Sequence, residues 1–250
     1  MTVAARQRPA ITRDRYHRYT YQGVAYPGAT GQAGILDKPA LANWMSRLTA
    51  EAAADLLDSL PKMLETVGRE GVVKALTSAA GKKSGEAMSA GTAIHAIAED
   101  VVKGRLVALP GGEAGRKAQQ VVDWWPTSGW RLRLAEAFVL NTTVGYGGTI
   151  DLLAYDEDGR TTLADWKSGS GVYHDVRLQL AAYGNAELIA PQDSPVAYPM
   201  PTVERYVVLH VTERGVFPID VDVDAQDWEA FMACIPLSRW QAARKGRLSA

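Results

Sequence analysis

The residue types best suited to chemistry in this chain lie in one stretch, residues 136–183. Asp151 follows Gly148-Thr149-Ile150 and opens an apolar run, and Asp165 and Lys167 stand at the end of the next apolar run. Two carboxylates and an ammonium group are costly to bury in a hydrophobic core but useful around a metal ion. These residue types therefore predict a divalent-cation site.

A divalent cation would suit hydrolysis of a phosphodiester, whose anionic oxygens repel an attacking nucleophile. Mg²⁺ or Mn²⁺ held by oxygen ligands neutralises that charge and lowers the pKa of bound water. Asp151 and Asp165 would supply carboxylates, and the backbone carbonyl of Trp166 a third oxygen. Lys167 would orient or help to deprotonate the water and stabilise the developing charge.

An ordinary salt bridge on a hairpin edge is the alternative interpretation, because Asp-x-Lys alone is a common sequence. Its position at a strand end, after Gly-Thr-Ile-Asp at hairpin spacing, favours the metal site. The upstream Glu136 and the downstream pair Gln179 and Tyr183 favour it further.

A β-hairpin is the element that would bring the two acids together. Residues 151–155 and 161–167 read as strands, and residues 156–160 contain an Asp-Gly turn signal. If the strands pair across that turn, Asp151 lies close to Asp165 and Lys167. Side chains two apart on a strand share a face, so Asp165 and Lys167 point the same way.

A helix predicted over residues 84–103 carries His95. Ser84 is a plausible N-cap and Gly104 a C-terminal stop. A lone histidine on a helix is usually a structural residue, so the pattern of this helix alone does not indicate a ligand.

Helical spacing also begins at residue 37. The spacing of apolar residues predicts further helices over 49–60, 61–80, 114–125, 173–190 and 225–245, the last kinked at Pro236. Strands are predicted near 203–211 and 215–222. Gln179 and Tyr183, four apart, would share one face of the helix over 173–190, which is either a polar edge or a face turned toward the acids. Residues 1–20 mix arginines with tyrosines; a solvated tail is favoured over a nucleic-acid contact.

Composition excludes several classes of protein. The chain has 250 residues, 47% of them hydrophobic, which allows one substantial core with a smaller helical part. Its net charge of -1 indicates no overall attraction to polyanions, and its one cysteine, Cys234, excludes a disulfide framework and a cysteine-ligated metal cluster. We find neither a P-loop nor a run long enough to span a membrane, and expect a cytoplasmic protein without a membrane partner.

Taken in order, the motifs resemble those of the PD-(D/E)xK nuclease superfamily, and most closely its RecB-like and Cas4-like exonuclease branch, which phages also encode. The resemblance covers roughly residues 91–183. It rests on Gly91–His95 (G-T-x-x-H), Glu136, Gly148–Asp151 (G-x-x-D), Asp165–Lys167 (D-x-K) and Gln179–Tyr183 (Q-x-x-x-Y).

The resemblance implies an α/β, restriction-endonuclease-like core with a mixed central β-sheet flanked by helices. We expect this nuclease core over residues 84–250, with an N-terminal arm and helical region over 1–83 packed on it. The implied metal ligands are His95, Asp151, Asp165 and the Trp166 carbonyl, and Lys167 is catalytic.

Glu136 would be a second-metal or water-mediated ligand or a partner of Lys167. Gln179 and Tyr183 would hold the site and the DNA strand, and Ser168 and Gly169 would contact DNA.

The implied function is a Mg²⁺- or Mn²⁺-dependent DNA exonuclease of phage or bacterial recombination, repair or replication. An endonuclease or junction resolvase on the same core, and a non-catalytic DNA-binding protein, are the alternatives. Many Cas4 proteins hold an iron-sulfur cluster with four cysteines, which this chain lacks, so we expect no such cluster. A helicase, recombinase or single-strand-binding partner would provide frayed or single-stranded DNA, in the host cytoplasm if a phage encodes the protein.

Overall fold

The computed structural model describes residues 10–169 and 171–244. Its contacts divide the chain into two compact units, one formed by Asp37–Ala93 and the other by the residues before and after it. This division differs from the predicted boundary at residue 83. Residues 10–36 belong to the same unit as the β-sheet, because their buried side chains pack on it.

The described elements are as follows. The helices are α1 (Ala29–Ala33), α2 (Pro39–Asp55), α3 (Leu60–Val102), α4 (Gly112–Trp124), α5 (Asp175–Gly184) and α6 (Ala225–Arg244). The strands are β1 (Ile11–Arg13), β2 (Tyr19–Tyr21), β3 (Val24–Tyr26), β4 (Arg131–Asn141), β5 (Tyr146–Tyr155), β6 (Thr161–Lys167), β7 (Leu188–Ala190), β8 (Tyr198–Pro199), β9 (Arg205–Thr212) and β10 (Gly215–Asp220).

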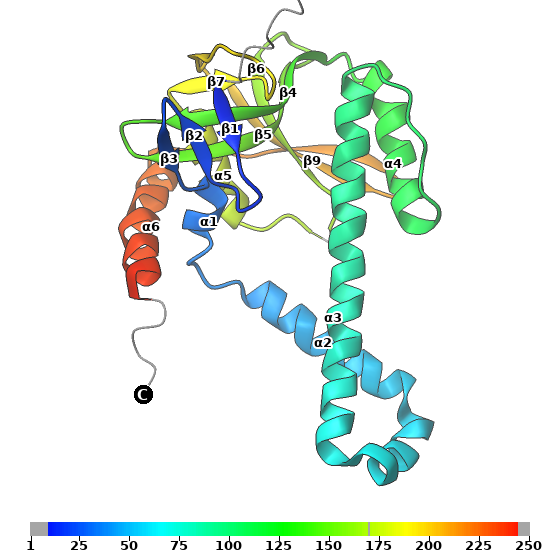
Figure 1. Ribbon diagram of the computed structural model, residues 1–250. Helices are drawn as coiled ribbons and strands as arrows, with labels where there is room; N and C mark the ends of the chain where they lie inside the picture. The colour runs from blue at the N-terminus through cyan, green and yellow to red at the C-terminus, as the bar shows by residue number, and fades with distance from the viewer. Residues whose placement is uncertain (1–9, 170, 245–250) are drawn as a thin grey trace, which may run out of the picture. The chain divides into compact units, whose positions relative to one another are not determined.

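A mixed seven-stranded sheet, in the order β10-β9-β6-β5-β4-β7-β8, forms the centre of the larger unit (Figure 1). β6 and β9 run parallel, and the other neighbours run antiparallel. An α/β fold with a mixed central sheet was predicted, and the hairpin of β5 and β6 forms as expected. The long strand β4 was not predicted, because arginines and Glu136 interrupt its apolar pattern.

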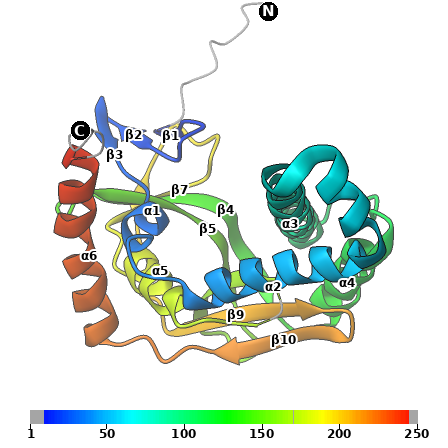
Figure 2. The ribbon, with the colours of Figure 1, turned by 90° about the horizontal axis from the view of Figure 1, so that it is seen from below.

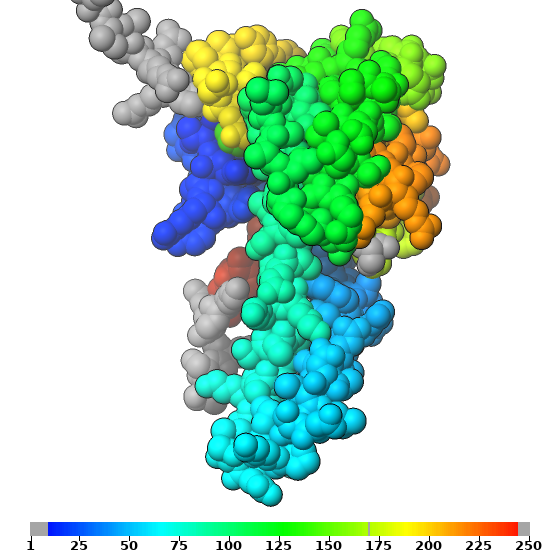
Figure 3. Space-filling model, turned by 90° about the vertical axis from the view of Figure 1, so that its right-hand side faces the viewer, coloured from blue at the N-terminus to red at the C-terminus, as the bar shows by residue number. Residues whose placement is uncertain are grey.

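Helices cover both faces of this sheet. α1, α5 and α6 gather on one face (Figure 2). Ile150, Leu180 and Phe231 are fully buried there in one core. The last turns of α3 and helix α4 cover the other face, with Ile94 and Trp166 in a second core. α4 also packs beside β10, and the two are neighbours on the surface in Figure 3.

A three-stranded antiparallel sheet, β1-β2-β3, packs on the outer part of β4. Ile11 and Tyr19 are buried there against Phe138. The ring of Tyr19 occupies the place of the side chain that Gly147 lacks, since a Cβ built on Gly147 would lie 2.6 Å from that ring. The prediction of a solvated tail over residues 1–20 is therefore wrong for residues 11–20, which form β1, a turn and the start of β2, and residues 1–9 lie outside the described part.

Several predicted helix limits also change. The separate helices predicted over 61–80 and 84–103 belong to one run, α3, which is kinked at Gly68 (φ 67°). Ser84 lies inside this run and therefore does not cap a helix. Gly104, at φ 69°, follows the end of α3 as expected. The helix predicted over 49–60 corresponds to the last turns of α2, which ends at Asp55, followed by a short 3-10 helix over Leu57–Ser59.

The helix predicted over 173–190 ends at Gly184. Residues 188–190 are instead the strand β7, because Ile189 pairs with Val139 of β4 and is buried beside it. α6 continues through Pro236 to Arg244. Within the described residues, no helix combines the length and the apolar composition needed to span a membrane.

Candidate metal centre

Asp151 and Asp165 lie where strands β5 and β6 separate. The ladder between the strands runs from Tyr155 and Thr161 to its last pair, Leu152 and Ala164. Each aspartate is the next residue beyond that pair. Oδ2 of Asp151 accepts a hydrogen bond of 2.9 Å from the backbone N–H of Trp166, which ties the two diverging strands together.

Glu136 lies opposite Asp151 on the neighbouring strand β4. The flanking pairs are Ala135 with Leu152 and Ala137 with Ile150, so these two acids face one another across the ladder. Glu136 has φ 53°, a left-handed conformation that is unfavourable for any residue with a Cβ. Like charges directly opposite also destabilise a sheet. The strained backbone of Glu136 and the repulsion between its carboxylate and that of Asp151 favour a functional role for these two residues.

His95 completes a three-ligand group with Glu136 and Asp151. Its Nδ1 lies 3.3 Å from Oδ2 of Asp151, and one ligand atom from each of the three residues lies within 4.8 Å of the others. Helix α3 brings His95 here from its last two turns. Of the three roles left open for Glu136, the geometry favours that of a ligand.

The electrostatics of the three-ligand group would favour a bound cation. Burial, aided by the charges of Asp151 and Glu99, raises the pKa of Glu136 to about 7. Burial, aided by Asp165, raises the pKa of Asp151 to about 6. The neighbouring positive charges are thus too few to offset the burial of these two carboxylates. Two carboxylates and an imidazole fit Mn²⁺, and the carboxylates fit Mg²⁺.

Asp165 is held by a different set of partners. Its Oδ2 lies 2.5 Å from Nζ of Lys167, and its Oδ1 accepts a hydrogen bond of 2.7 Å from Nε2 of Gln179. Burial disfavours the ammonium form of Lys167, but the attraction of Asp165 and Asp151 outweighs it and raises the pKa of Lys167. Asp165 lies outside the three-ligand group, so its part in binding the ion, like that of the Trp166 carbonyl, stays a prediction.

The loop after Lys167 is fixed by two residues that the sequence did not single out. Nζ of Lys117, in α4, donates a hydrogen bond of 2.8 Å to the carbonyl of Ser168. Nε2 of His210, in β9, lies 3.0 Å from the carbonyl of Gly169. Contact of Ser168 and Gly169 with DNA stays a prediction.

Tyr183 packs behind the site. Its side chain is 5% exposed, which leaves too little surface for the expected direct contact with a DNA strand. A Cβ built on Gly148 would lie 2.3 Å from Cε1 of Tyr183. The glycine of G-x-x-D and the tyrosine of Q-x-x-x-Y thus form one packing unit, which holds β5 against α5.

Replacing Gly148 by Ala should therefore destabilise the protein by about 1–3 kcal/mol, because the buried ring of Tyr183 must move. We expect a fall in Tm of about 3–10 °C by circular dichroism. Gly31→Ala is the matched control, since a Cβ at Gly31 in α1 meets no atom within 4 Å. Equal Tm values for the two variants would contradict this packing.

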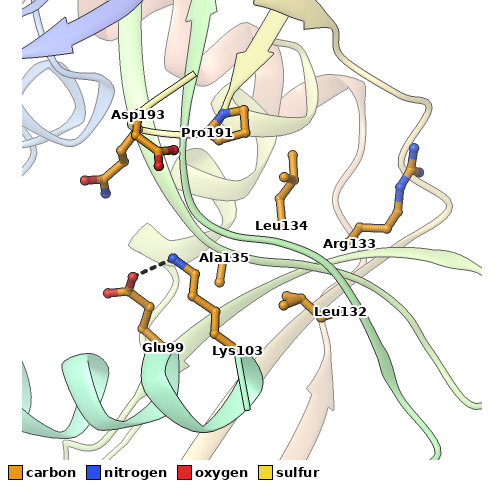
Figure 4. A pocket seen from close by; sticks show the side chains of 9 residues that line it. Glu99, Lys103, Leu132, Arg133, Leu134, Ala135, Pro191 and Asp193 are labelled. Atoms are coloured by element: carbon orange, nitrogen blue, oxygen red, sulfur yellow. Dashed lines mark hydrogen bonds and ion pairs between the residues drawn. The ribbon is translucent and has the colours of Figure 1, made fainter. Parts of the chain in front are cut away.

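A pocket of about 390 Å³ is lined by residues that neighbour Glu136 and His95 in the chain, but by none of the three ligands themselves (Figure 4). Strand residues 132–135 of β4, just before Glu136, form one wall, and residues 191–193 form another. Glu99 and Lys103, one and two turns beyond His95, pair with one another at 2.6 Å on the third side.

A second cluster of acids, Asp156, Glu157 and Asp158, also lies within 4.8 Å. Cations of the chain already neutralise it. Oδ2 of Asp156 lies 2.9 Å from Arg160 and 3.1 Å from Arg205, and these contacts hold the pKa of Asp156 below its ordinary value despite burial. This turn is therefore a structural ion-pair network.

The raised pKa of Glu136 predicts how the metal-free protein responds to pH. The folded state binds this proton more tightly than the unfolded state, whose pKa is near the ordinary 4.5. The contribution of Glu136 to the free energy of unfolding is therefore largest below about pH 4.5 and is lost as the pH rises through about 7. Asp151, raised to about 6, adds a loss of the same sign.

Glu136→Gln should remove the larger of these losses. In EDTA, we expect the difference in Tm, variant minus wild type, to be about 4–8 °C larger at pH 8 than at pH 5. This corresponds to a change on the order of 2 kcal/mol in the free energy of unfolding. Mn²⁺ should raise the Tm of the wild type more at pH 8 than at pH 5, because protons compete for the ligands. Parallel Tm curves for the two proteins would contradict this prediction.

Comparison with known proteins gives no relative on which to base an identification. No protein-family model matches the chain, and no curated protein sequence matches it. The resemblance to PD-(D/E)xK nucleases therefore depends on the motifs and on the geometry of their residues.

Proposed function

We propose that this protein is a divalent-metal-dependent deoxyribonuclease with a restriction-endonuclease-like core, which hydrolyses phosphodiester bonds from a DNA end. The observation that carries the proposal is the convergence of His95, Glu136 and Asp151 beside the pair Asp165 and Lys167. These residues come from four elements, α3, β4, β5 and β6. A protein that only bound DNA would have no use for opposed, destabilising carboxylates at this place.

The chain's own residues have distinct tasks in the proposed reaction. His95, Glu136 and Asp151 would hold Mg²⁺ or Mn²⁺. Once bound, the cation supplies positive charge that offsets the phosphodiester oxygens and acidifies water. Lys167, kept protonated by Asp165, stabilises the negative charge that develops on phosphorus and its oxygens. Gln179 fixes the carboxylate of Asp165 and so the direction of Lys167.

An assay on end-labelled DNA tests the proposal. Single- and double-stranded substrates are incubated with Mg²⁺, with Mn²⁺ or with EDTA, beside a covalently closed circle. We expect mononucleotides or short products with metal, none with EDTA, and an intact circle. Cleavage of the circle would indicate an endonuclease or resolvase on the same core. DNA binding without cleavage under every condition would contradict the proposal.

A further inference from the structure

Arg13, in the N-terminal sheet, reaches the strand that carries Asp151. Its Nη1 donates a hydrogen bond of 3.1 Å to Oγ1 of Thr149. The Tyr19 hydroxyl lies 2.9 Å from the same Oγ1. The guanidinium also lies over the ring of Phe138, 5.7 Å from its centre, which limits its motion. Arg13 is thus an exposed cation that neighbouring strands hold in place.

No acidic side chain among the described residues pairs with Arg13, although acids lie nearby. Its charge lowers the pKa of Glu136 against the opposing effect of burial. The other arginines of this sheet differ. Arg18 pairs with Asp14 at 2.9 Å, and Arg15 bonds the hydroxyl of its neighbour Tyr16 at 2.7 Å. Of the three arginines, Arg13 is the one that bonds the strand carrying Asp151.

Thr149 and Asp151 are two apart on β5, which separates them by roughly 7 Å along the strand. That distance is comparable to the spacing of successive phosphates along a nucleic-acid strand. An arginine presents a planar fork of N–H donors that matches phosphate oxygens. Its free donors are therefore suited to an anion next to the one at the three ligands.

We propose that Arg13, positioned by Thr149 and Tyr19, forms a phosphate-binding subsite for the phosphate adjacent to the scissile one. This subsite rests on the proposed nuclease function. It would orient the strand and strengthen its binding, and it leaves the chemical step to the three ligands and Lys167. The ligand is a phosphate group of DNA, either an internal phosphodiester or a terminal phosphate.

The test measures DNA affinity apart from cleavage. Fluorescence anisotropy of a labelled single-stranded oligonucleotide, in EDTA and in an Asp151→Asn background, gives Kd at several salt concentrations. Adding Arg13→Gln should weaken binding about 10-fold and reduce the salt slope by about 0.7, the value for one lost phosphate contact. Arg15→Gln is the matched control and should change Kd less than twofold.

Two further arms sharpen the outcome. Oligonucleotides with hydroxyl or phosphate ends distinguish the sources of the phosphate: an effect of Arg13→Gln confined to phosphorylated ends assigns a terminal phosphate, and an equal effect assigns an internal one. Arg13→Lys keeps the charge but loses the planar fork, so its affinity should lie between those of the wild type and Arg13→Gln, and this partial recovery checks that Arg13→Gln acts through charge rather than folding. Equal losses in Arg13→Gln and Arg15→Gln, or no loss in either, would overturn the subsite. Failure of the proposed function would appear separately, as absence of cleavage by the wild type.

Discussion

Replacing Asp151 by Asn is expected to reduce metal-dependent DNA cleavage by about a thousandfold or more while the protein stays folded. Asp151 faces His95 and Glu136, so its loss removes a carboxylate from the centre of the three-ligand group. The amide oxygen of Asn can still accept the hydrogen bond that Asp151 takes from the Trp166 N–H. The strands should therefore keep their junction.

The same substitution should leave the metal-free protein at least as stable as wild type. It removes one of two opposed charges, and the pKa of Glu136 should fall toward its ordinary value because Asp151 contributes to its rise. Tm in EDTA at pH 8 and cleavage in Mn²⁺ are measured on the same preparation. Asp158→Asn is the control, an exposed acid of the neighbouring turn. Cleavage near the wild-type rate by Asp151→Asn would remove this residue from the site.

The hairpin and its acids were predictable because their signals are local. An Asp-Gly turn between two apolar runs specifies the pairing of β5 with β6, and that pairing places Asp151 near Asp165. The ion pair of Asp165 with Lys167 follows from strand periodicity. Each of these expectations needed only the residues between Asp151 and Lys167.

Glu136 and Arg13 required information that is not local. The left-handed backbone at Glu136 breaks the alternation of β4, so that Ala135 and Ala137 belong to different cores, and no propensity indicates it. Arg13 lies 136 residues before Thr149, its hydrogen-bond partner. The signal that could have revealed the N-terminal sheet was Gly147, whose missing side chain accommodates Tyr19.

The limits of α5 show how tertiary pairing overrides a helical pattern. Residues 173–190 are apolar enough for one helix, and Pro191 would end it. Ile189 gains a place in the central sheet next to Val139, and the turn at Asn185 lets the chain reach it. Gln179 and Tyr183 remain on the helical part, so their relation to the site did not depend on where the helix ended.

Lys167→Met is expected to impair both stability and cleavage. Asp165 is 4% exposed in its side chain, and removal of Lys167 leaves its charge buried with Gln179 as its partner. Because the Lys167 side chain is 35% exposed, solvent screens part of the pair, and its loss should cost roughly 2 kcal/mol, a fall in Tm of about 4–8 °C for a chain of this size. A single variant therefore cannot separate a catalytic lysine from a structural one.

The double variant Asp165→Asn/Lys167→Met makes that separation. Neutralising both groups removes the uncompensated charge, so its Tm should return to within a few degrees of wild type, whereas cleavage should stay reduced by about a hundredfold or more. If Lys167 acts as the cation that the raised pKa indicates, cleavage by the wild type at pH 7 needs no deprotonation of this lysine. Recovery of cleavage together with stability in the double variant would show that the pair only holds the strand ends in place, and catalysis would then have to be assigned to the three ligands alone.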